Sequence, residues 1–317
     1  MVFVPSMPGQ TSNDVHIVPR EGAEKNVPAK ENDPPGTSVV AKPIHVTVDL
    51  VEVPVVVTDA MNRSITGLMK SNFALYEDSK PQEIRYFMAE EVPISIAVLF
   101  DVSKSMADKV ETERAALHQF FDNANPADEY FAVSFSDKPR LLDGPTQAID
   151  EVEQKLMSIQ PGGSTSMLDA VYMAESLLRS ARYQRKAIVI FSDGGDNASR
   201  YTLHDVKRLV AESDVQIYAI GLFETFFFNT IEEKLGKKWL SEITDRTGGR
   251  TLAVENRSKV PEAAAAVSRE LRAEYLLGYK PTSFDGKWRK IKVRVISPTG
   301  DERLQAYYKR GYYSPER

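Results

Sequence analysis

The chain has 317 residues, enough for about two domains, and it contains no cysteine. Hydrophobic residues make up 42% and charged residues 27%, the mix of a globular protein. The absence of cysteine excludes disulfides, thiol nucleophiles and thiolate metal sites, and a net charge of −5 argues against a nucleic-acid partner. No apolar stretch approaches the roughly 18 residues of a membrane helix, so we expect no insertion into a membrane.

The first 43 residues hold seven of the 18 prolines and show no periodic apolar pattern. Prolines at this density interrupt helices and central strands, so the composition predicts a disordered arm over residues 1–43. Residues 1–6 lack the basic and apolar regions of a signal peptide. We therefore expect either a cytoplasmic protein or one whose leader was removed or lies upstream of this sequence.

Residues 44–92 alternate between apolar and polar side chains, which is the pattern of strands with one buried face. We expect one or two strands within Val46–Val57, a turn at Asp59–Arg63, and further strands at Phe73–Asp78 and Ile84–Phe87. The segment is predicted to be a small antiparallel β unit.

From residue 93 the pattern changes to alternating strands and helices, which is typical of a mainly parallel sheet with helices on both faces. The expected strands are Ile94–Phe100, Tyr130–Phe135, Ala187–Phe191, Val215–Gly221 and Thr251–Val254. The expected helices are Val110–Ala124, Ala148–Met157, Met167–Leu178, Leu203–Ala211, Ile231–Thr247 and Val260–Glu274. We expect Gly248 and Gly249 to end the fifth of these helices and Ser258 to open the sixth as its N-cap.

The tail returns to strands, expected at Tyr275–Tyr279, Lys290–Ile296 and Leu304–Tyr308. These strands lack the crossover helices that parallel pairing needs, so we expect them to pair with the early strands. The sequence thus predicts a doubly wound, mainly parallel, Rossmann-like α/β domain at residues 93–273. This domain is inserted into a small antiparallel, β-sandwich-like domain made of residues 44–92 and 274–317.

A candidate cation site lies at one edge of the predicted α/β sheet, because ligands of open parallel sheets bind at the carboxyl ends of the strands. Three polar motifs fall there: Asp-Val-Ser-Lys-Ser after the first strand, Gly-Gly-Ser-Thr-Ser before the helix at Met167, and Ser-Asp-Gly after the strand Ala187–Phe191. Their oxygens are hard donors, which favour Mg²⁺, Mn²⁺ or Ca²⁺ over zinc or copper. The candidate ligands are Asp101, Ser103, Ser105, Thr165 and Asp193.

The order of these motifs resembles the von Willebrand factor type A (VWFA) domain and its metal-ion-dependent adhesion site, over residues 94–272. The resemblance implies that Ser103, Ser105 and Thr165 contact the metal by hydroxyl, while Asp101 and Asp193 act partly through water. It also implies that the last helix shifts when a ligand binds. With only two carboxylates among its donors, the cation would accept a further anionic ligand, an exposed Asp or Glu of a partner protein.

The flanking strands extend the resemblance to residues 44–315 and to bacterial VWFA-related proteins abundant in Acidobacteria, which implies an extracytoplasmic location. One residue departs from the pattern: Lys104 stands where these turns often carry glycine. Its positive charge would weaken metal affinity or favour an acidic partner.

Structural roles compete with the metal assignments. Asp101, Ser103 and Ser105 have the side chains of helix N-caps, which accept hydrogen bonds from backbone N–H groups. Thr165 has the same alternative, as the N-cap of the helix that begins at Met167.

Other residues at this edge are expected to be structural. We predict that Asp169 stabilises the start of its helix and that Asp196 and Asn197 are loop residues, with an outer coordination role as the alternative. The aromatic run Phe226–Phe228 is expected to pack under the helix at Ile231, and an exposed docking patch is its alternative.

These features favour a metal-dependent protein–protein interaction module that is not an enzyme. A Mg²⁺-dependent hydrolase or phosphotransfer enzyme is the first alternative, but the chain has no G-x-x-x-x-G-K-[ST] loop and no G-x-S-x-G elbow. An aspartyl phosphatase would also need a second Asp where Ser103 stands. A metal-free scaffold is the second alternative, and the complete set of five candidate ligands argues against it.

Overall fold

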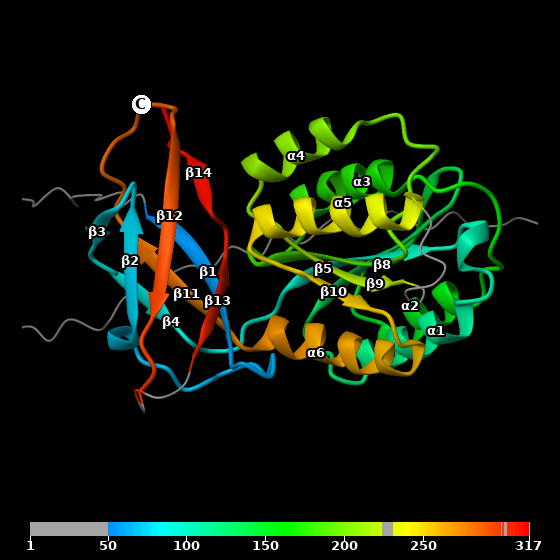
Figure 1. Ribbon diagram of the computed structural model, residues 1–317, viewed down its shortest axis with the longest axis horizontal. Helices are drawn as coiled ribbons and strands as arrows, with labels where there is room; N and C mark the ends of the chain where they lie inside the picture. Colours follow the sequence, from blue (N-terminus) through cyan, green and yellow to red (C-terminus); the bar gives the residue numbers. More distant parts are fainter. Residues whose placement is uncertain (1–49, 224–230, 299, 301–302, 317) are drawn as a thin grey trace, which may run out of the picture. The chain divides into compact units, whose positions relative to one another are not determined.

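The computed structural model describes residues 50–223, 231–298, 300 and 303–316 (Figure 1). The predicted arm at residues 1–43 and the aromatic run Phe226–Phe228 lie outside the described residues. None of the helices in the described part of the chain has the length and apolar character needed to cross a bilayer.

The central sheet is made of six strands. They are β5 (Ser95–Asp101), β6 (Glu129–Phe135), β7 (Pro139–Thr146), β8 (Lys186–Ser192), β9 (Gln216–Leu222) and β10 (Thr251–Val254). Their order is β10-β9-β8-β5-β6-β7, and all pairs are parallel except β6 with β7. Every residue of β5, β6 and β9 is buried, as expected for strands covered on both faces. The predicted mainly parallel α/β sheet is therefore confirmed.

Sequence reasoning missed strand β7. It contains Pro139, Gly144 and Pro145, residues that weaken any strand pattern. The strand lies at the edge of the sheet and pairs on one side only, with β6. An edge strand tolerates proline because one row of its backbone groups faces away from the sheet.

Helices cover both faces of this sheet (Figure 1). They are α1 (Val110–Phe121), α2 (Ile149–Met157), α3 (Met167–Arg179), α4 (Leu203–Glu212), α5 (Ile231–Thr247) and α6 (Val260–Arg272). Helices α1, α2 and α6 share a hydrophobic cluster with Ile96, Val98 and Phe100 of β5. Helices α3, α4 and α5 share another with Ala97 and Leu99. Successive residues of β5 thus point into opposite layers, as a doubly wound fold requires.

The helix ends agree with the sequence at α5 and differ at α6. Helix α5 ends at Thr247, and Gly248 follows in the left-handed region with φ of +89°, as predicted. Helix α6 follows the short 3-10 helix η3 (Arg257–Lys259). The N-cap residue of η3 is Asn256, and the Asn256 side chain accepts a hydrogen bond from Ser258 N. The prediction that Ser258 opens α6 as N-cap is therefore wrong, because Ser258 lies inside η3.

Two further sheets, each of four antiparallel strands, are built from residues on either side of the α/β segment. Their strands are β1 (Val51–Thr58), β2 (Phe73–Glu77), β3 (Lys80–Gln82), β4 (Tyr86–Met88), β11 (Glu274–Tyr279), β12 (Trp288–Val295), β13 (Gln305–Tyr308) and β14 (Gly311–Tyr313). The orders are β13-β1-β11-β4 and β14-β12-β2-β3. Because β1 pairs with β11 and β13, and β2 with β12, the predicted pairing of the tail with the early strands is confirmed.

One hydrophobic cluster joins these two sheets and includes Val53, Leu75, Tyr275 and Ile291. The shared cluster supports the domain division that we propose. Residues 44–92 and 274–317 would form one β domain, and residues 93–273 the inserted α/β domain.

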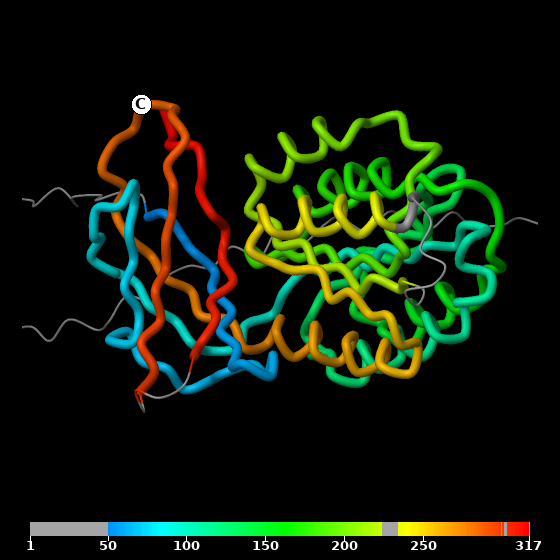
Figure 2. Tube along the Cα trace, viewed as in Figure 1, coloured from blue at the N-terminus to red at the C-terminus, as the bar shows by residue number. Residues whose placement is uncertain are grey.

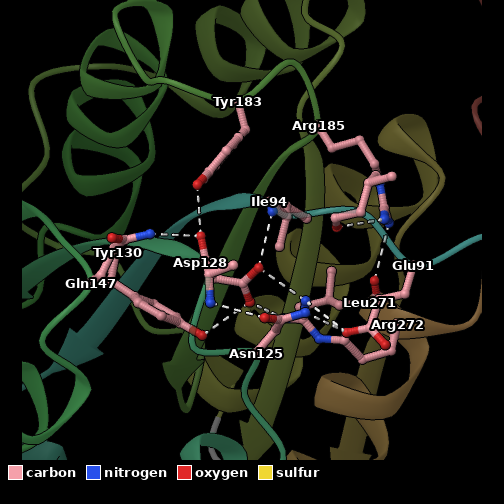
Figure 3. A network of polar contacts seen from close by, with 12 residues as sticks. Glu91, Ile94, Asn125, Asp128, Tyr130, Gln147, Tyr183, Arg185, Leu271 and Arg272 are labelled. Atoms are coloured by element: carbon pink, nitrogen blue, oxygen red, sulfur yellow. Dashed lines mark hydrogen bonds and ion pairs between the residues drawn. The ribbon is translucent and has the colours of Figure 1, made fainter.

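The chain enters and leaves the α/β segment at the same end (Figure 2). There the buried Asp128 accepts hydrogen bonds from Ile94 N at 3.0 Å and from Arg272 Nη1 at 3.0 Å (Figure 3). Arg272 also lies 3.7 Å from Glu91, on the segment that leads into β5. These contacts tie the beginnings of β5 and β6 to the end of α6, at the edge of the sheet opposite Asp101.

Candidate metal centre

Asp101 is the last residue of β5, and its side chain is completely buried at the carboxyl end of the sheet. Its Oδ1 accepts a hydrogen bond from Ser103 N at 2.9 Å, and its Oδ2 accepts one from Ser192 Oγ at 2.6 Å. The carboxylate therefore fixes the tight turn after β5 and holds the end of β8 beside it.

The hydroxyls of Ser103 and Ser105 lie side by side, with their Oγ atoms 3.1 Å apart. Ser103 is buried and Ser105 is exposed, so the pair runs from the interior to the surface. The 3-10 helix η2 (Lys104–Met106) and then α1 begin here, but neither receives a capping hydrogen bond from a side chain. Ser103 is the N-cap residue of η2, but the N-cap alternative is wrong for the hydroxyls of Ser103 and Ser105, which make no capping bond, whereas Asp101 does accept the backbone N–H of Ser103.

Backbone hydrogen bonds hold the loop that carries Thr165 against this turn. Gly162 N donates to Val102 O at 2.7 Å, and Lys104 N donates to Gly163 O at 3.0 Å. Thr165 itself is buried, at 5% exposure. The Gly-Gly-Ser-Thr-Ser loop and the Asp-Val-Ser-Lys-Ser turn thus form one unit, although they are about 60 residues apart in the sequence.

Asp193 follows β8 directly, and its Oδ1 accepts a hydrogen bond from Gly195 N at 3.2 Å. A Cβ placed on Gly195 would lie 3.3 Å from Asp193 Oδ1 and 3.9 Å from Thr165 Oγ1. These two oxygens therefore border the same small space, which glycine leaves open. The structure brings all the candidate ligands to the carboxyl edge of the sheet: Asp101, Ser103, Ser105, Thr165 and Asp193.

Two charged residues that sequence reasoning missed lie buried at this edge. Lys109, the N-cap residue of α1, places its Nζ 3.1 Å from Asp193 Oδ2, and both side chains are about 95% buried. Glu113, one turn further along α1, is completely buried, and neither of its carboxylate oxygens has a hydrogen-bond partner among the described residues. The burial of these two residues was not predictable from the sequence pattern, because charged residues at the start of a helix are normally solvated.

Burial and neighbouring negative charge raise the pKa values of Asp101 and Glu113. Burial, and next the charge of Asp193, raise the pKa of Asp101 to about 7, although hydrogen bonds from Ser103 and Ser192 oppose the shift. Burial, and next the charge of Asp101, raise the pKa of Glu113 well above its usual range. Negative charge is thus costly here without a compensating cation, and a bound divalent ion would supply that compensation.

The donor set fits a hard divalent cation. Within the described ranges, no group of three or more His, Asp or Glu side chains is placed to hold a metal. A cation at this edge would therefore depend on the hydroxyls of Ser103, Ser105 and Thr165 in addition to the two aspartates. Hydroxyl and carboxylate oxygens suit Mg²⁺, Mn²⁺ or Ca²⁺.

The start of α3 is capped by the loop after β8 and not by Thr165. Leu168 N donates to Asp196 Oδ2 at 2.8 Å, whereas Ser166, the N-cap residue, makes no side-chain capping bond. The capping alternative for Thr165 is therefore wrong. Asp196 is a loop residue, as expected, and it also satisfies a backbone donor of the helix that follows Thr165.

Asn197 and Asp169 also join α3 to this loop. Thr165 N donates to Asn197 Oδ1 at 2.9 Å, which fixes the backbone of the candidate ligand. Asp169 lies in the first turn of α3, as expected, and its Oδ1 accepts hydrogen bonds from Arg200 N at 2.9 Å and Tyr201 N at 3.0 Å. The position of Thr165 therefore depends on residues about 30 positions away in the sequence.

Comparison with known proteins bears on the α/β segment. A family model described as von Willebrand factor type A domain matches residues 96–195. The inter-alpha-trypsin inhibitor heavy chain H4 of Bos taurus is 28% identical over 127 residues, which are 35% of this chain and 14% of that protein. The Homo sapiens H4 chain is 24% identical over 146 residues, 41% of this chain and 16% of that protein. The chain thus spans less than a fifth of the length of these relatives.

One similar solved structure is that of von Willebrand factor type A from Catenulispora acidiphila, with 12% sequence identity and a TM-score of 0.49. The superposed region covers 84% of this chain and 74% of that chain. Proximal thread matrix protein 1 from the mussel byssus, with a zinc-occupied MIDAS motif, is 18% identical with a TM-score of 0.47 and covers 62% of this chain and 50% of that one. The family match therefore shows that residues 96–195, within the α/β segment, are similar to a von Willebrand factor type A domain.

Proposed function

We propose that the chain binds a partner protein through a divalent cation at the carboxyl edge of its α/β sheet. The observation that carries this proposal is the pair of hydroxyls of Ser103 and Ser105, 3.1 Å apart and without a capping hydrogen bond, beside the buried carboxyls of Asp101 and Asp193. Domains of this family typically mediate protein–protein interactions, and the relatives that match this chain belong to it.

In this proposal Ser103, Ser105 and Thr165 bind the cation by hydroxyl, and Asp101 and Asp193 act partly through water. The bound cation would supply an open coordination position to which an oxygen of the partner adds. The donors favour Mg²⁺, with Mn²⁺ and Ca²⁺ as alternatives, since all three prefer oxygen ligands.

An acidic residue of the partner is the proposed ligand, and exposed basic side chains around the site support this choice. Lys104 lies within the turn, Lys138 on the loop after β6, and Arg200 on the loop after β8, and all three are exposed. The Lys138 loop contacts the site directly, because Asp137 Oδ1 accepts a hydrogen bond from Ser164 N at 2.7 Å. Positive charge at the rim attracts an acidic surface and raises its association rate.

The proposal includes no catalysis. A hydroxyl nucleophile needs an adjacent base, and the described histidines lie elsewhere, His118 on α1 against Glu153 at 2.9 Å and His204 on α4. By resemblance, we further propose an extracytoplasmic location and membership of the bacterial VWFA-related proteins.

The test is capture of a partner from a native extract on the immobilised chain. We expect a protein that is retained in Mg²⁺, released by EDTA and absent from beads that carry Asp101→Asn. Retention of the same proteins in EDTA would contradict the proposal, because docking would then not use the cation. Asp137→Asn, which removes an exposed carboxylate from the same rim, is the matched control and should retain the partner.

A further inference from the structure

The candidate metal centre contains a cation of its own. The ammonium of Lys109 lies 3.1 Å from Asp193 Oδ2, and only 5% of the lysine side chain and 6% of the aspartate side chain are exposed. Asp193 Oδ1 already accepts the backbone N–H of Gly195. The oxygen that Lys109 contacts is therefore the one with no backbone donor, and the ammonium neutralises Asp193 where water is excluded.

A divalent cation and this ammonium oppose each other. Both are attracted to Asp193, and two positive charges repel strongly in a buried, low-dielectric environment. Lysine carries its charge on a flexible four-carbon chain, so the ammonium is able to move while α1 stays in place.

Glu113 offers the displaced ammonium a second carboxyl group. Glu113 N donates to Lys109 O at 3.0 Å, so the two residues lie one helical turn apart and on the same face of α1. Both oxygens of the Glu113 carboxyl are buried and have no hydrogen-bond partner among the described residues. The start of α1 therefore carries Lys109 in contact with Asp193 and, one turn further along the same face, the buried carboxyl of Glu113.

We propose that Lys109 is the resident counter-ion of the metal centre: its ammonium neutralises Asp193 when no metal is bound, and leaves Asp193 for Glu113 when a divalent cation binds. Lys109 thereby sets the metal affinity of the site. This inference rests on the proposed function, and it specifies how the same site is regulated.

The competing explanation is that Lys109 positions Asp193 for the metal, and the two predict opposite results. If Lys109 competes with the metal, Lys109→Met, which keeps an unbranched side chain one atom shorter and removes the charge, raises Mg²⁺ affinity at least tenfold. If Lys109 positions Asp193, the same substitution lowers that affinity. Lys104→Met is the matched control, because it removes an equal charge from an exposed position of the same turn. Its effect should stay below about threefold, since water and salt screen an exposed charge.

The experiment is isothermal titration of MgCl₂ into the whole chain, with thermal unfolding in EDTA as a second measurement. We expect Lys109→Met to bind Mg²⁺ more tightly than wild type and to unfold at a lower temperature in EDTA, because Asp193 is then buried without its counter-ion. If Lys109→Met does not fold, Glu113→Gln is compared with the double variant Lys109→Met/Glu113→Gln. The double variant should bind Mg²⁺ more tightly.

The outcomes separate this inference from the proposed function. Equal or weaker binding by Lys109→Met, with wild type binding Mg²⁺, overturns the counter-ion role and leaves the proposed function intact. Binding by Lys109→Met alone supports the counter-ion role and contradicts metal binding by the wild-type site. Absence of binding in both overturns both proposals.

Discussion

Replacing Glu175 by glutamine is expected to stabilise the protein at pH 8 far more than at pH 5. Glu175 lies on α3 with 3% of its surface exposed. Ser213 Oγ donates to its Oε2 at 2.9 Å, and its Oε1 has no hydrogen-bond partner among the described residues. Burial is the main cause that raises the pKa of Glu175 from 4.5 to about 7.

The sign follows from the direction of the shift. The folded protein holds this proton more tightly than the unfolded chain, so the group's contribution to stability is complete below pH 4.5 and is lost as the pH rises through about 7. At 1.36 kcal/mol per pH unit, the loss reaches about 3 kcal/mol at pH 8, of which about 1 kcal/mol has occurred by pH 5. Glutamine does not titrate, so the advantage of Glu175→Gln should grow by about 2 kcal/mol between pH 5 and pH 8.

Urea denaturation of wild type and variant at both pH values measures this difference directly, because other titrating groups cancel in the comparison. Glu151→Gln, at an exposed position on α2, is the matched control and should show no such growth. The same stability difference between wild type and Glu175→Gln at pH 5 and pH 8 would refute the reasoning, since it would mean that the ionised carboxylate finds good solvation in the folded protein.

Two further predictions concern contacts that hold the α/β domain together. Arg272→Met removes the cation that pairs with the fully buried Asp128. In urea denaturation this variant should lower the free energy of unfolding by about 3–5 kcal/mol. The control Arg269→Met, at an exposed position of the same helix, should change that free energy by less than about 0.5 kcal/mol. Asp196→Ala removes the acceptor of Leu168 N and should lower the free energy of unfolding by about 0.5–2 kcal/mol. The same variant should weaken Mg²⁺ binding in calorimetry. Unchanged Mg²⁺ binding would show that Thr165 does not depend on this cap.

Local sequence patterns were sufficient for five of the six strands of the α/β sheet and for the position of the candidate site. The strands β5, β8 and β9 are nearly continuous apolar runs because both their faces are covered, and such runs are readable without a structure. The carboxyl ends of parallel strands meet at one edge. That rule alone predicted that Asp101 and Asp193 lie close together. It also predicted that the polar motifs that contain them lie at the same edge of the sheet.

Features that depend on distant partners were not predictable. The burial of Lys109 and Glu113 depends on the residues that pack over the first turn of α1. Lysine and glutamate are themselves the residue types of an ordinary solvated helical turn. The cap on α3 comes from Asp196, 28 residues beyond the donor Leu168. Strand β7 contains the glycine and prolines of a loop and is a strand because β6 offers it a free edge.

The central claim is that the carboxyl edge of the sheet binds a divalent cation, and calorimetric titration of Mg²⁺ into wild type and Asp101→Asn tests it most directly. Asparagine keeps the size of the side chain and an oxygen that accepts from Ser103 N, but removes the charge. The account predicts saturable binding of one Mg²⁺ by wild type, loss of that binding in Asp101→Asn, and little change in the control Asp137→Asn. Equal Mg²⁺ binding by wild type and Asp101→Asn would contradict the account.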